Sequence, residues 1–238
     1  SKLGLRNSPS EVKLNSSAVL VVDQMTNKTI LEKNSNAVLP IASVTKLMTA
    51  IVVLESNVPL HQRIYITKSE AKLERYNFSR LKIGTSYTRD ELLRLALMSS
   101  ENRAAHALAR TYSGGVQGFV NAMNAKSKLL GMTSTIFTEP TGLNSGNVSS
   151  PKDLAILVDE ASRVPKIRKY STSEKLKIKI KNKLQNFKNS NSLIRNESWN
   201  LEISKTGFIR PSGKCLVMLA NIKNKPFIII LLDAQGNK

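Results

Sequence analysis

The chain of 238 residues and 26.3 kDa can bury one full-sized core, and its 41% hydrophobic and 22% charged residues exclude wholesale disorder and a fibrous fold. Its longest apolar runs, such as residues 227–232, fall short of the ~18 residues that a membrane-spanning helix needs. The single cysteine, Cys215, excludes an internal disulfide. With only two histidines a Cys/His zinc site has too few ligands, so we expect no metal and no cofactor.

Positive charge is unevenly distributed along the chain. Lys and Arg number 36 against 17 Asp and Glu, and the formal net charge of +19 favours anionic partners. Residues 163–188 contain ten basic residues and one acid, Glu174. Lysine alternates with Leu or Ile over residues 175–181, which predicts a strand with one lysine face. Two interpretations stay open: a face that attracts an anionic polymer, or a solvated edge strand protected by its charge.

The first predicted element is a β-hairpin, with β-branched runs at residues 18–23 and 29–32 separated by a polar turn. Pro40 is then predicted to open a helix. Among the seventeen residues 38–54 the sole ionisable residue is Lys46, and apolar residues surround the helix on all sides. Such a helix belongs in the middle of a domain.

The middle of the chain is predicted to be helical. Thr88 and Glu91 form a capping box before one helix, and a Ser-Ser pair separates it from a second helix over residues 101–112. A third helix covers residues 116–130 and ends before a glycine. Ser150, followed by proline, caps the start of the next.

Three strands are predicted at the end of the chain, over residues 200–209, 214–222 and 226–233. Strands at both termini with helices between them predict an α/β protein of the α+β type. We expect a five-stranded antiparallel sheet, built from both termini and covered by helices. Residues 1–238 are expected to form one domain, with a helical subdomain at about 67–162 inserted between sheet strands.

Ser43 and Lys46 stand three residues apart on one face of the apolar helix, as a serine nucleophile and its lysine base do. The spacing alone is weak, because residues 10–13 and 69–72 also read Ser-x-x-Lys. Only Ser43 opens a buried helix, where desolvation lowers the pKa of an amine. The alternative is a helix-capping serine beside a lysine that reaches solvent.

Two further motifs follow in the chain. Ser100 and Asn102 lie at the predicted junction between two helices, where a short loop can present both side chains to a cleft or merely cap a helix. Lys205-Thr206-Gly207 lies on a predicted strand, and a glycine there permits close approach of a ligand backbone. The alternative for these residues is a β-bulge with a solvated lysine.

The order and separations of these motifs, 57 and then 105 residues, are those of a known catalytic triplet, and the sequence resembles the penicillin-recognising serine acyltransferases. Among them it is most similar to the low-molecular-mass D-alanyl-D-alanine peptidases, in particular endopeptidases of the penicillin-binding protein 7/8 type. The resemblance covers about residues 18–233 and implies a β-lactamase/transpeptidase-like fold. The stretches that carry it include PIASVTKLMTA, LMSSENRAA, AMNAKSKLLGMTSTIFTEPTGLN, SLIRNESW and SKTGF.

The resemblance implies a role for each matching residue. Ser43 is expected to be the acylated nucleophile, Lys46 its general base, and Ser100 the relay of a proton to the departing amine. The backbone N–H groups of Ser43 and Phe208 are expected to form the oxyanion hole.

Substrate binding is expected from the remaining motif residues. Asn102 would hold the substrate amide, Lys205 would supply positive potential, and Thr206 would bind the terminal carboxylate. Gly207 and Phe208 complete the set of expected substrate-binding residues.

The resemblance therefore implies hydrolysis of peptide cross-links in peptidoglycan through a serine acyl-enzyme, with β-lactams as covalent inhibitors. D-alanyl-D-alanine carboxypeptidase activity is the alternative. A class A β-lactamase is a more remote alternative. Such enzymes need a glutamate in an E-x-x-L-N arrangement, and in this chain the stretch from Glu139 to Asn144 contains one residue too many. A non-catalytic polyanion-binding protein is also remote, because aromatic residues make up only 5% of the chain and no nucleic-acid motif occurs.

Location and partners follow from the same resemblance. The expected location is the periplasm. The protein would be in its mature form here, because the first residues contain no signal-peptide apolar region. Relatives usually continue into a helix packed on the sheet, which this sequence does not reach. The expected partners are peptidoglycan cross-links, β-lactams and, through electrostatic association, the anionic sacculus; no nucleic-acid partner and no transmembrane segment are expected.

Overall fold

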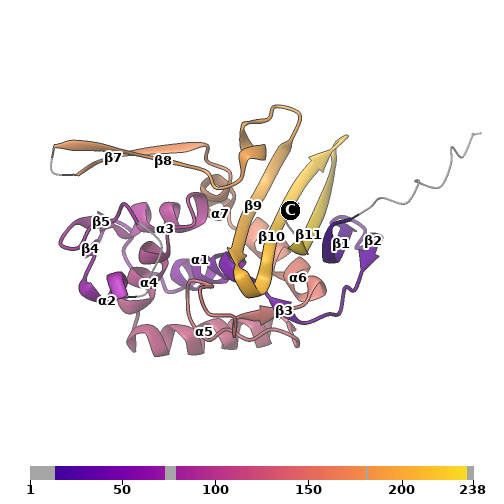
Figure 1. The fold of residues 1–238 in the computed structure, drawn as a ribbon, viewed down its shortest axis with the longest axis horizontal. Coiled ribbons are helices and arrows are strands. Elements are labelled where there is room, and N and C mark those ends of the chain that lie inside the picture. The colour runs from indigo at the N-terminus through magenta and orange to yellow at the C-terminus, as the bar shows by residue number, and fades with distance from the viewer. Residues whose placement is uncertain (1–13, 73–78, 181, 235–238) are drawn as a thin grey trace, which may run out of the picture.

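A five-stranded antiparallel sheet forms one side of the molecule and helices fill the other (Figure 1). The computed structural model describes residues 14–72, 79–180 and 182–234. The strand order is β2-β1-β11-β10-β9. The strands span β1 (Ser16–Asp23), β2 (Thr29–Lys33), β9 (Asn200–Ile209), β10 (Gly213–Ile222) and β11 (Lys225–Ala234). The predicted sheet built from both ends of the chain is confirmed, because β1 pairs with β11 along its length.

Alternate residues of the sheet point into the core. Leu20 on β1 and Ile230 on β11 are paired neighbours, and both are buried on the face that meets helix α6 (Pro151–Ser162). Apolar residues run continuously along β11, and it is their burial that alternates: Ile228, Ile230 and Leu232 are buried on this face, whereas the residues between them are only partly buried. No helix in the described ranges is long and apolar enough to cross a membrane.

The predicted helices form where the sequence provides start signals. The Thr88 side chain accepts a hydrogen bond from the Glu91 N–H and Glu91 bonds back to the Thr88 N–H, which confirms the capping box. Ser150 caps α6, with Pro151 in its first turn. The other helices are α2 (Lys68–Lys72), α3 (Arg89–Met98), α4 (Asn102–Arg110), α5 (Gly115–Leu129) and α7 (Pro165–Ser171).

The prediction that Pro40 opens the buried helix is wrong. Leu39 and Pro40 form a short strand, β3 (Leu39–Pro40), which pairs with β6 (Val148–Ser149). Ala42 then has a left-handed backbone with φ of +46°, which an α-helix cannot include. A 3₁₀ turn, η1 (Ala42–Thr45), leads into α1 (Lys46–Glu55).

The basic segment forms a separate hairpin of β7 (Lys175–Ile180) and β8 (Lys183–Lys188), which extends over the helical part in Figure 1. The predicted alternating strand is confirmed for β7, but its partner β8 was not predicted. On the inner face Ile178 and Phe187 are buried, and the Arg80 guanidinium lies 4.5 Å from the centre of the Phe187 ring. Smaller elements complete the described fold: β4 (Arg63–Tyr65), β5 (Ser86–Thr88), η2 (Ser192–Arg195) and η3 (Arg210–Ser212).

Candidate active site

Ser43 lies on η1, directly before the buried helix α1, and its hydroxyl meets the side chain of Lys46. Lys46 is fully buried, and its Nζ is 2.8 Å from Ser43 Oγ. The same Nζ donates to Asn102 Oδ1 at 2.7 Å and to the Thr141 carbonyl oxygen at 2.6 Å. Two residues that are distant in the sequence, Asn102 and Thr141, therefore hold the Lys46 amine beside the Ser43 hydroxyl.

The partners of Lys46 determine which proton arrangements the site permits. The Asn102 and Thr141 oxygens are acceptors, so they use two N–H groups of the amine. A neutral amine then has its lone pair left for the third neighbour, the Ser43 hydroxyl. The geometry is thus suited to accepting the Ser43 proton.

A second lysine meets a second serine in the same cleft. Lys205 on β9 is 1% exposed, and its Nζ donates to Ser100 Oγ at 2.9 Å and to the Thr206 carbonyl oxygen at 2.8 Å. Burial lowers the pKa of Lys205 well below its ordinary value, and the charge of Lys46 lowers it further. Ser100 lies between α3 and α4 with φ of +59°, a left-handed conformation that is rare for serine and persists only where the surrounding structure holds it.

Two glycines allow the chain segments of the site to approach one another. A Cβ on Gly207 would lie 2.9 Å from the Ser43 nitrogen, and one on Gly142 would lie 1.9 Å from the Ala42 carbonyl oxygen. Gly142 also has φ of +85°, which disfavours any side chain. The glycine of the Lys-Thr-Gly motif therefore has a packing reason that the sequence did not indicate: β9 must lie against the backbone of the serine.

The cleft between these segments is a cavity of about 540 Å³. The lining residues that belong to the predicted site are Ser43, Ser100, Asn102, Thr206, Gly207 and Phe208. Lys46 and Lys205 lie beneath this lining, and each is hydrogen-bonded to a serine that lines the cavity. All eight sequence-predicted site residues are thus brought together.

Sequence reasoning missed several residues of the cleft. The Thr141 carbonyl binds Lys46, and the Ser190 hydroxyl lies 2.6 Å from Thr206 Oγ1. A backbone carbonyl has no sequence signature, and Ser190 stands in a polar stretch without a recognisable motif. The chance Ser-x-x-Lys match at Ser69 and Lys72 lies on α2 with both residues exposed, and the match at residues 10–13 lies outside the described residues.

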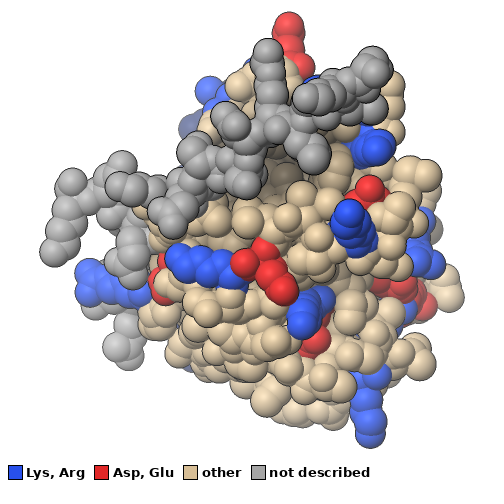
Figure 2. All heavy atoms as spheres, turned by 90° about the vertical axis from the view of Figure 1, so that its right-hand side faces the viewer, with Lys and Arg blue, Asp and Glu red and all other residues tan. Residues whose placement is uncertain are grey.

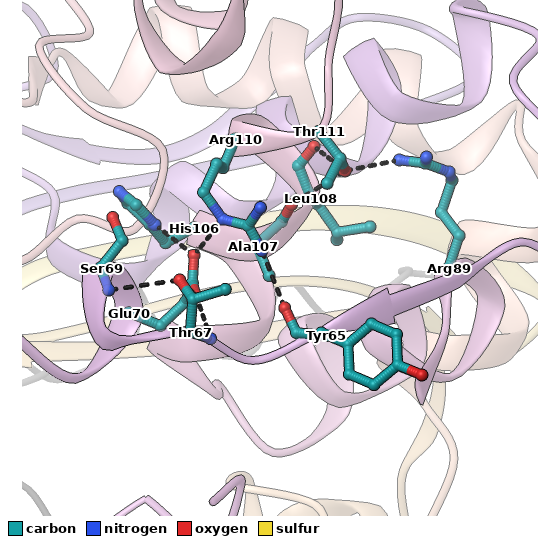
Figure 3. A network of polar contacts seen from close by, with 10 residues as sticks. All are labelled: Tyr65, Thr67, Ser69, Glu70, Arg89, His106, Ala107, Leu108, Arg110 and Thr111. Carbon is teal, nitrogen blue, oxygen red and sulfur yellow. Dashed lines mark hydrogen bonds and ion pairs between the residues drawn. The ribbon is translucent and has the colours of Figure 1, made fainter. Parts of the chain in front are cut away.

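A buried ionic network lies on the helical side of the cleft (Figure 3). Glu70 on α2 is fully buried and accepts hydrogen bonds from His106 Nδ1 at 3.0 Å, Arg110 Nε at 2.7 Å and the Thr67 N–H at 2.7 Å. Burial alone would raise the pKa of Glu70, but the hydrogen bonds from His106, Thr67 and Arg110 outweigh it and lower the pKa to about 2. No motif in the sequence links Glu70 with His106, so this partnership was not predicted.

Comparisons with known proteins agree on one family. The sequence profile of the D-alanyl-D-alanine carboxypeptidases, peptidase family S11, matches residues 5–236. D-alanyl-D-alanine endopeptidases of Pseudomonas aeruginosa and Escherichia coli K12 are 44% and 40% identical, over 96% and 99% of this chain and 74% and 76% of theirs. The Streptomyces K15 DD-transpeptidase is 26% identical with a TM-score of 0.87, and the alignment covers 97% of this chain and 93% of that one.

Proposed function

The chain belongs to the D-alanyl-D-alanine carboxypeptidase family, peptidase family S11, and we propose that it is a periplasmic endopeptidase that hydrolyses peptide cross-links of peptidoglycan. The observation that carries this proposal is the pair of buried lysine–serine contacts, Lys46 with Ser43 and Lys205 with Ser100, at 2.8 Å and 2.9 Å. The periplasm is the compartment in which such a substrate is found.

In the proposed acylation, Ser43 Oγ attacks the carbonyl carbon of the D-alanine residue before the cleaved bond, and Lys46 Nζ accepts the hydroxyl proton. The backbone N–H groups of Ser43 and Phe208 stabilise the negative charge that develops on the carbonyl oxygen. Ser100 relays the proton that Lys46 accepted to the departing amine, so both residues regain their starting protonation and an ester on Ser43 remains. Water then hydrolyses that ester, which restores the Ser43 hydroxyl and releases the carboxylic acid.

Substrate recognition is assigned to the residues that surround these two contacts. Asn102 holds the substrate amide, Thr206 binds a substrate carboxylate, and Lys205 supplies positive potential. Gly207 allows β9 to lie beside the Ser43 backbone. Thr206 and Ser43 line the same cavity, which supports this assignment.

A β-lactam would follow the same route, with its ring nitrogen as the departing amine that stays tethered. Slow release of the drug is supported by the surroundings of Glu139, the loop carboxylate nearest to a β-lactamase pattern. Its oxygens already accept hydrogen bonds from the N–H groups of Thr141 and Gly142 and from the Thr141 hydroxyl. We therefore propose covalent inhibition, not fast turnover.

The lysine face of β7 and β8 gives a proposed second contact with the wall. Lys175, Lys177 and Lys179 are exposed on β7, and residues 175–188 contain no Asp or Glu. Figure 2, which looks at the molecule from the side away from the hairpin tip, shows Lys and Arg interspersed with acidic side chains. The concentrated positive face therefore favours electrostatic association of the hairpin with the anionic sacculus.

Labelling with a fluorescent penicillin tests the acyl-enzyme proposal. Intact-protein mass spectrometry should find one adduct, and peptide mapping should place it on Ser43. The adduct should be absent in Ser43→Ala and retained in Ser69→Ala, the matched serine of the chance motif. An adduct that survives Ser43→Ala, or rapid release of hydrolysed drug, would contradict the proposal.

The preference for cross-links is tested separately with purified muropeptides. The protein should convert cross-linked dimers to monomers faster than it releases the terminal D-alanine from pentapeptides. Chromatography that detects D-alanine release without loss of dimers would instead assign carboxypeptidase activity.

A further inference from the structure

The loop of residues 139–147 lies against the buried helix α1, which begins at Lys46. Lys46 Nζ donates to the Thr141 carbonyl oxygen of this loop at 2.6 Å. The preceding carbonyl, that of Pro140, accepts in the same way from the Thr49 hydroxyl at 2.7 Å. All four residues are buried, so a carbonyl that moved away would leave a buried donor without its acceptor.

The carboxylate of Glu139 holds the peptide group that presents the Thr141 carbonyl. Its Oε2 accepts hydrogen bonds from the Thr141 N–H at 2.7 Å and from the Thr141 hydroxyl at 2.5 Å, and its Oε1 accepts from the Gly142 N–H. The Gly142 N–H and the Thr141 carbonyl belong to one planar trans peptide group, so they point in opposite directions. The carboxylate that binds this N–H therefore sets the direction in which the carbonyl points.

The rest of the loop is packed on the same segment of the chain. Asn147 is fully buried, and its Nδ2 donates to Thr45 Oγ1 at 3.0 Å. A Cβ on Gly142, which has φ of +85°, would lie 1.9 Å from the Ala42 carbonyl oxygen, so the peptide group lies directly on the turn before α1. Among the described residues, Glu139 provides the hydrogen bond to the Gly142 N–H. The direction of this peptide group therefore depends on Glu139.

We propose that Glu139 is a positioning residue for the general base, which directs the Thr141 carbonyl at Lys46 Nζ. The carbonyl and Asn102 Oδ1 each take one N–H of the amine, which leaves the lone pair of a neutral amine directed at the Ser43 hydroxyl. Glu139 acts through the carbonyl and takes no part in the proton transfer. The inference rests on the proposed function, because Lys46 must be the base that accepts the Ser43 proton.

The first test is the pH profile of penicillin acylation in Glu139→Gln. The amide has about the size of the carboxylate, but it replaces one acceptor oxygen with an NH₂ donor, which repels one of the two N–H groups that Glu139 binds. The maximum rate, reached where the amine is neutral, should fall about tenfold because the lone pair is no longer directed at Ser43. The midpoint of the profile should move about one pH unit lower, because the ammonium form of Lys46 loses an acceptor.

Asp153→Asn is the matched control. Asp153 on α6 accepts hydrogen bonds from the Ser134 N–H and the Thr135 hydroxyl, both at 2.7 Å, so it holds a turn much as Glu139 does. Its hydrogen bonds in the described structure do not reach the loop of residues 139–147. Asp153→Asn should therefore lower the melting temperature, as Glu139→Gln does, but leave both the maximum acylation rate and the midpoint unchanged.

A second measurement needs no catalysis. Nuclear magnetic resonance of lysine labelled with ¹³C at Cε follows the protonation of each amine, and the Lys46 signal is assigned by its absence in Lys46→Arg. This signal should titrate about one pH unit lower in Glu139→Gln than in the parent and in Asp153→Asn. Lys205, whose pKa the charge of Lys46 lowers, and His106, which lines a cavity together with Glu139, are present in all three proteins. Their own titration is therefore common to the comparison.

A lower midpoint without a lower maximum rate would mean that Glu139 acts through its charge alone, and an unchanged midpoint would mean that the carbonyl keeps its direction. Either result would overturn the inference. If Glu139→Gln does not fold, Thr141→Val removes only the hydroxyl donor to Glu139 and keeps the carbonyl. It should change both quantities in the same direction by a smaller factor, and parent values in Thr141→Val would contradict the assigned role.

Failure of the proposed function gives a different result. The parent protein would then form no penicillin adduct on Ser43, whereas the titration of the Lys46 signal would still show whether Glu139 controls the surroundings of this amine.

Discussion

Two groups of lysines lie in opposite surroundings in this protein. Lys46 and Lys205 in the cleft are 0% and 1% exposed, and each contacts a serine hydroxyl. Lys175, Lys177 and Lys179 on the hairpin are exposed. One side-chain type thus behaves in two ways: burial favours the neutral amine, which can accept a proton, whereas water keeps an exposed lysine a solvated point charge.

The two regions also respond to different variables. Burial and the charge of Lys46 lower the pKa of Lys205, so the charge of the buried region depends on pH. The exposed face acts on a polymer through solvent, so salt screens it over a Debye length of about 10 Å at 0.1 M ionic strength. A change confined to one region can therefore be measured with the other region as its control.

The largest effect is expected for Lys46→Arg. Arginine keeps the positive charge but cannot act as a base, so acylation by penicillin should slow by at least ~10²-fold, the scale for losing a general base. Rates of fluorescent penicillin labelling measure it, with Lys177→Arg as the matched exposed control. A Lys46→Arg protein that acylates at nearly the parent rate would mean that the base lies elsewhere.

The pH dependence of acylation is the next largest effect. Below the apparent pKa of the lysine pair, the rate should rise by up to about tenfold per pH unit, because only the deprotonated amine accepts the serine proton. Burial, and then the charge of Lys46, lower the pKa of Lys205, so the two lysines together should lose their first proton well below the ~10.4 of free lysine, and the rise should end there. The apparent value belongs to the coupled lysines jointly. An acylation rate that does not change from pH 6 to pH 9 would show that no lysine acts as the base.

Removing charge from the hairpin should have a moderate effect on wall binding alone. Changing Lys175, Lys177, Lys179 and Lys188 to Gln should weaken sacculus pull-down by about tenfold, since each exposed charge contributes roughly 0.2–1 kcal/mol. Binding of the parent should also fall steeply with salt, while the rate of penicillin acylation stays constant. Retention that is independent of salt would favour the interpretation of a merely solvated strand.

The smallest effect concerns stability. The pKa of Lys205 is lower in the folded chain than in the unfolded chain, so between these values the unfolded chain binds more protons and the free energy of unfolding rises with pH. Relative to Lys205→Met, the parent should therefore gain stability between pH 7 and pH 10 in denaturant titrations. Lys177→Met should stay within about 0.5 kcal/mol of the parent at both pH values. An equal pH response of parent and Lys205→Met would contradict the assigned burial effect.

Sequence reasoning predicted the sheet, the main helices and the three motifs of the cleft, because each rests on local signals. The Thr88 capping box and the period-two strands are visible over a few residues. The single charge in an apolar helix marked Lys46 as unusual. The separations of Ser43, Ser100 and Lys205 supplied the resemblance that joined them.

What the sequence did not predict depends on contacts between distant segments. A proline suits the start of a helix, which is why the sequence predicts one at Pro40, but the pairing of Pro40 with β6, more than a hundred residues away, prevails. Glu70 and His106 meet across 36 residues without a shared motif. Gly207 has close contact with the Ser43 backbone, which no strand pattern reveals.

The residues of the cleft come from distant parts of the chain, so only the folded protein brings them together. Lys46 draws its partners from residues 43, 102 and 141, and Lys205 reaches Ser100 across 105 residues. An unfolded chain therefore contains every reactive group but no assembled nucleophile. If Ser43 is the acylated residue, the fraction of molecules that a penicillin labels counts the chains that have reached the native arrangement. The same reagent would then follow refolding in real time. Circular dichroism reports helical content, so it cannot distinguish partly packed helices from molecules with an assembled cleft.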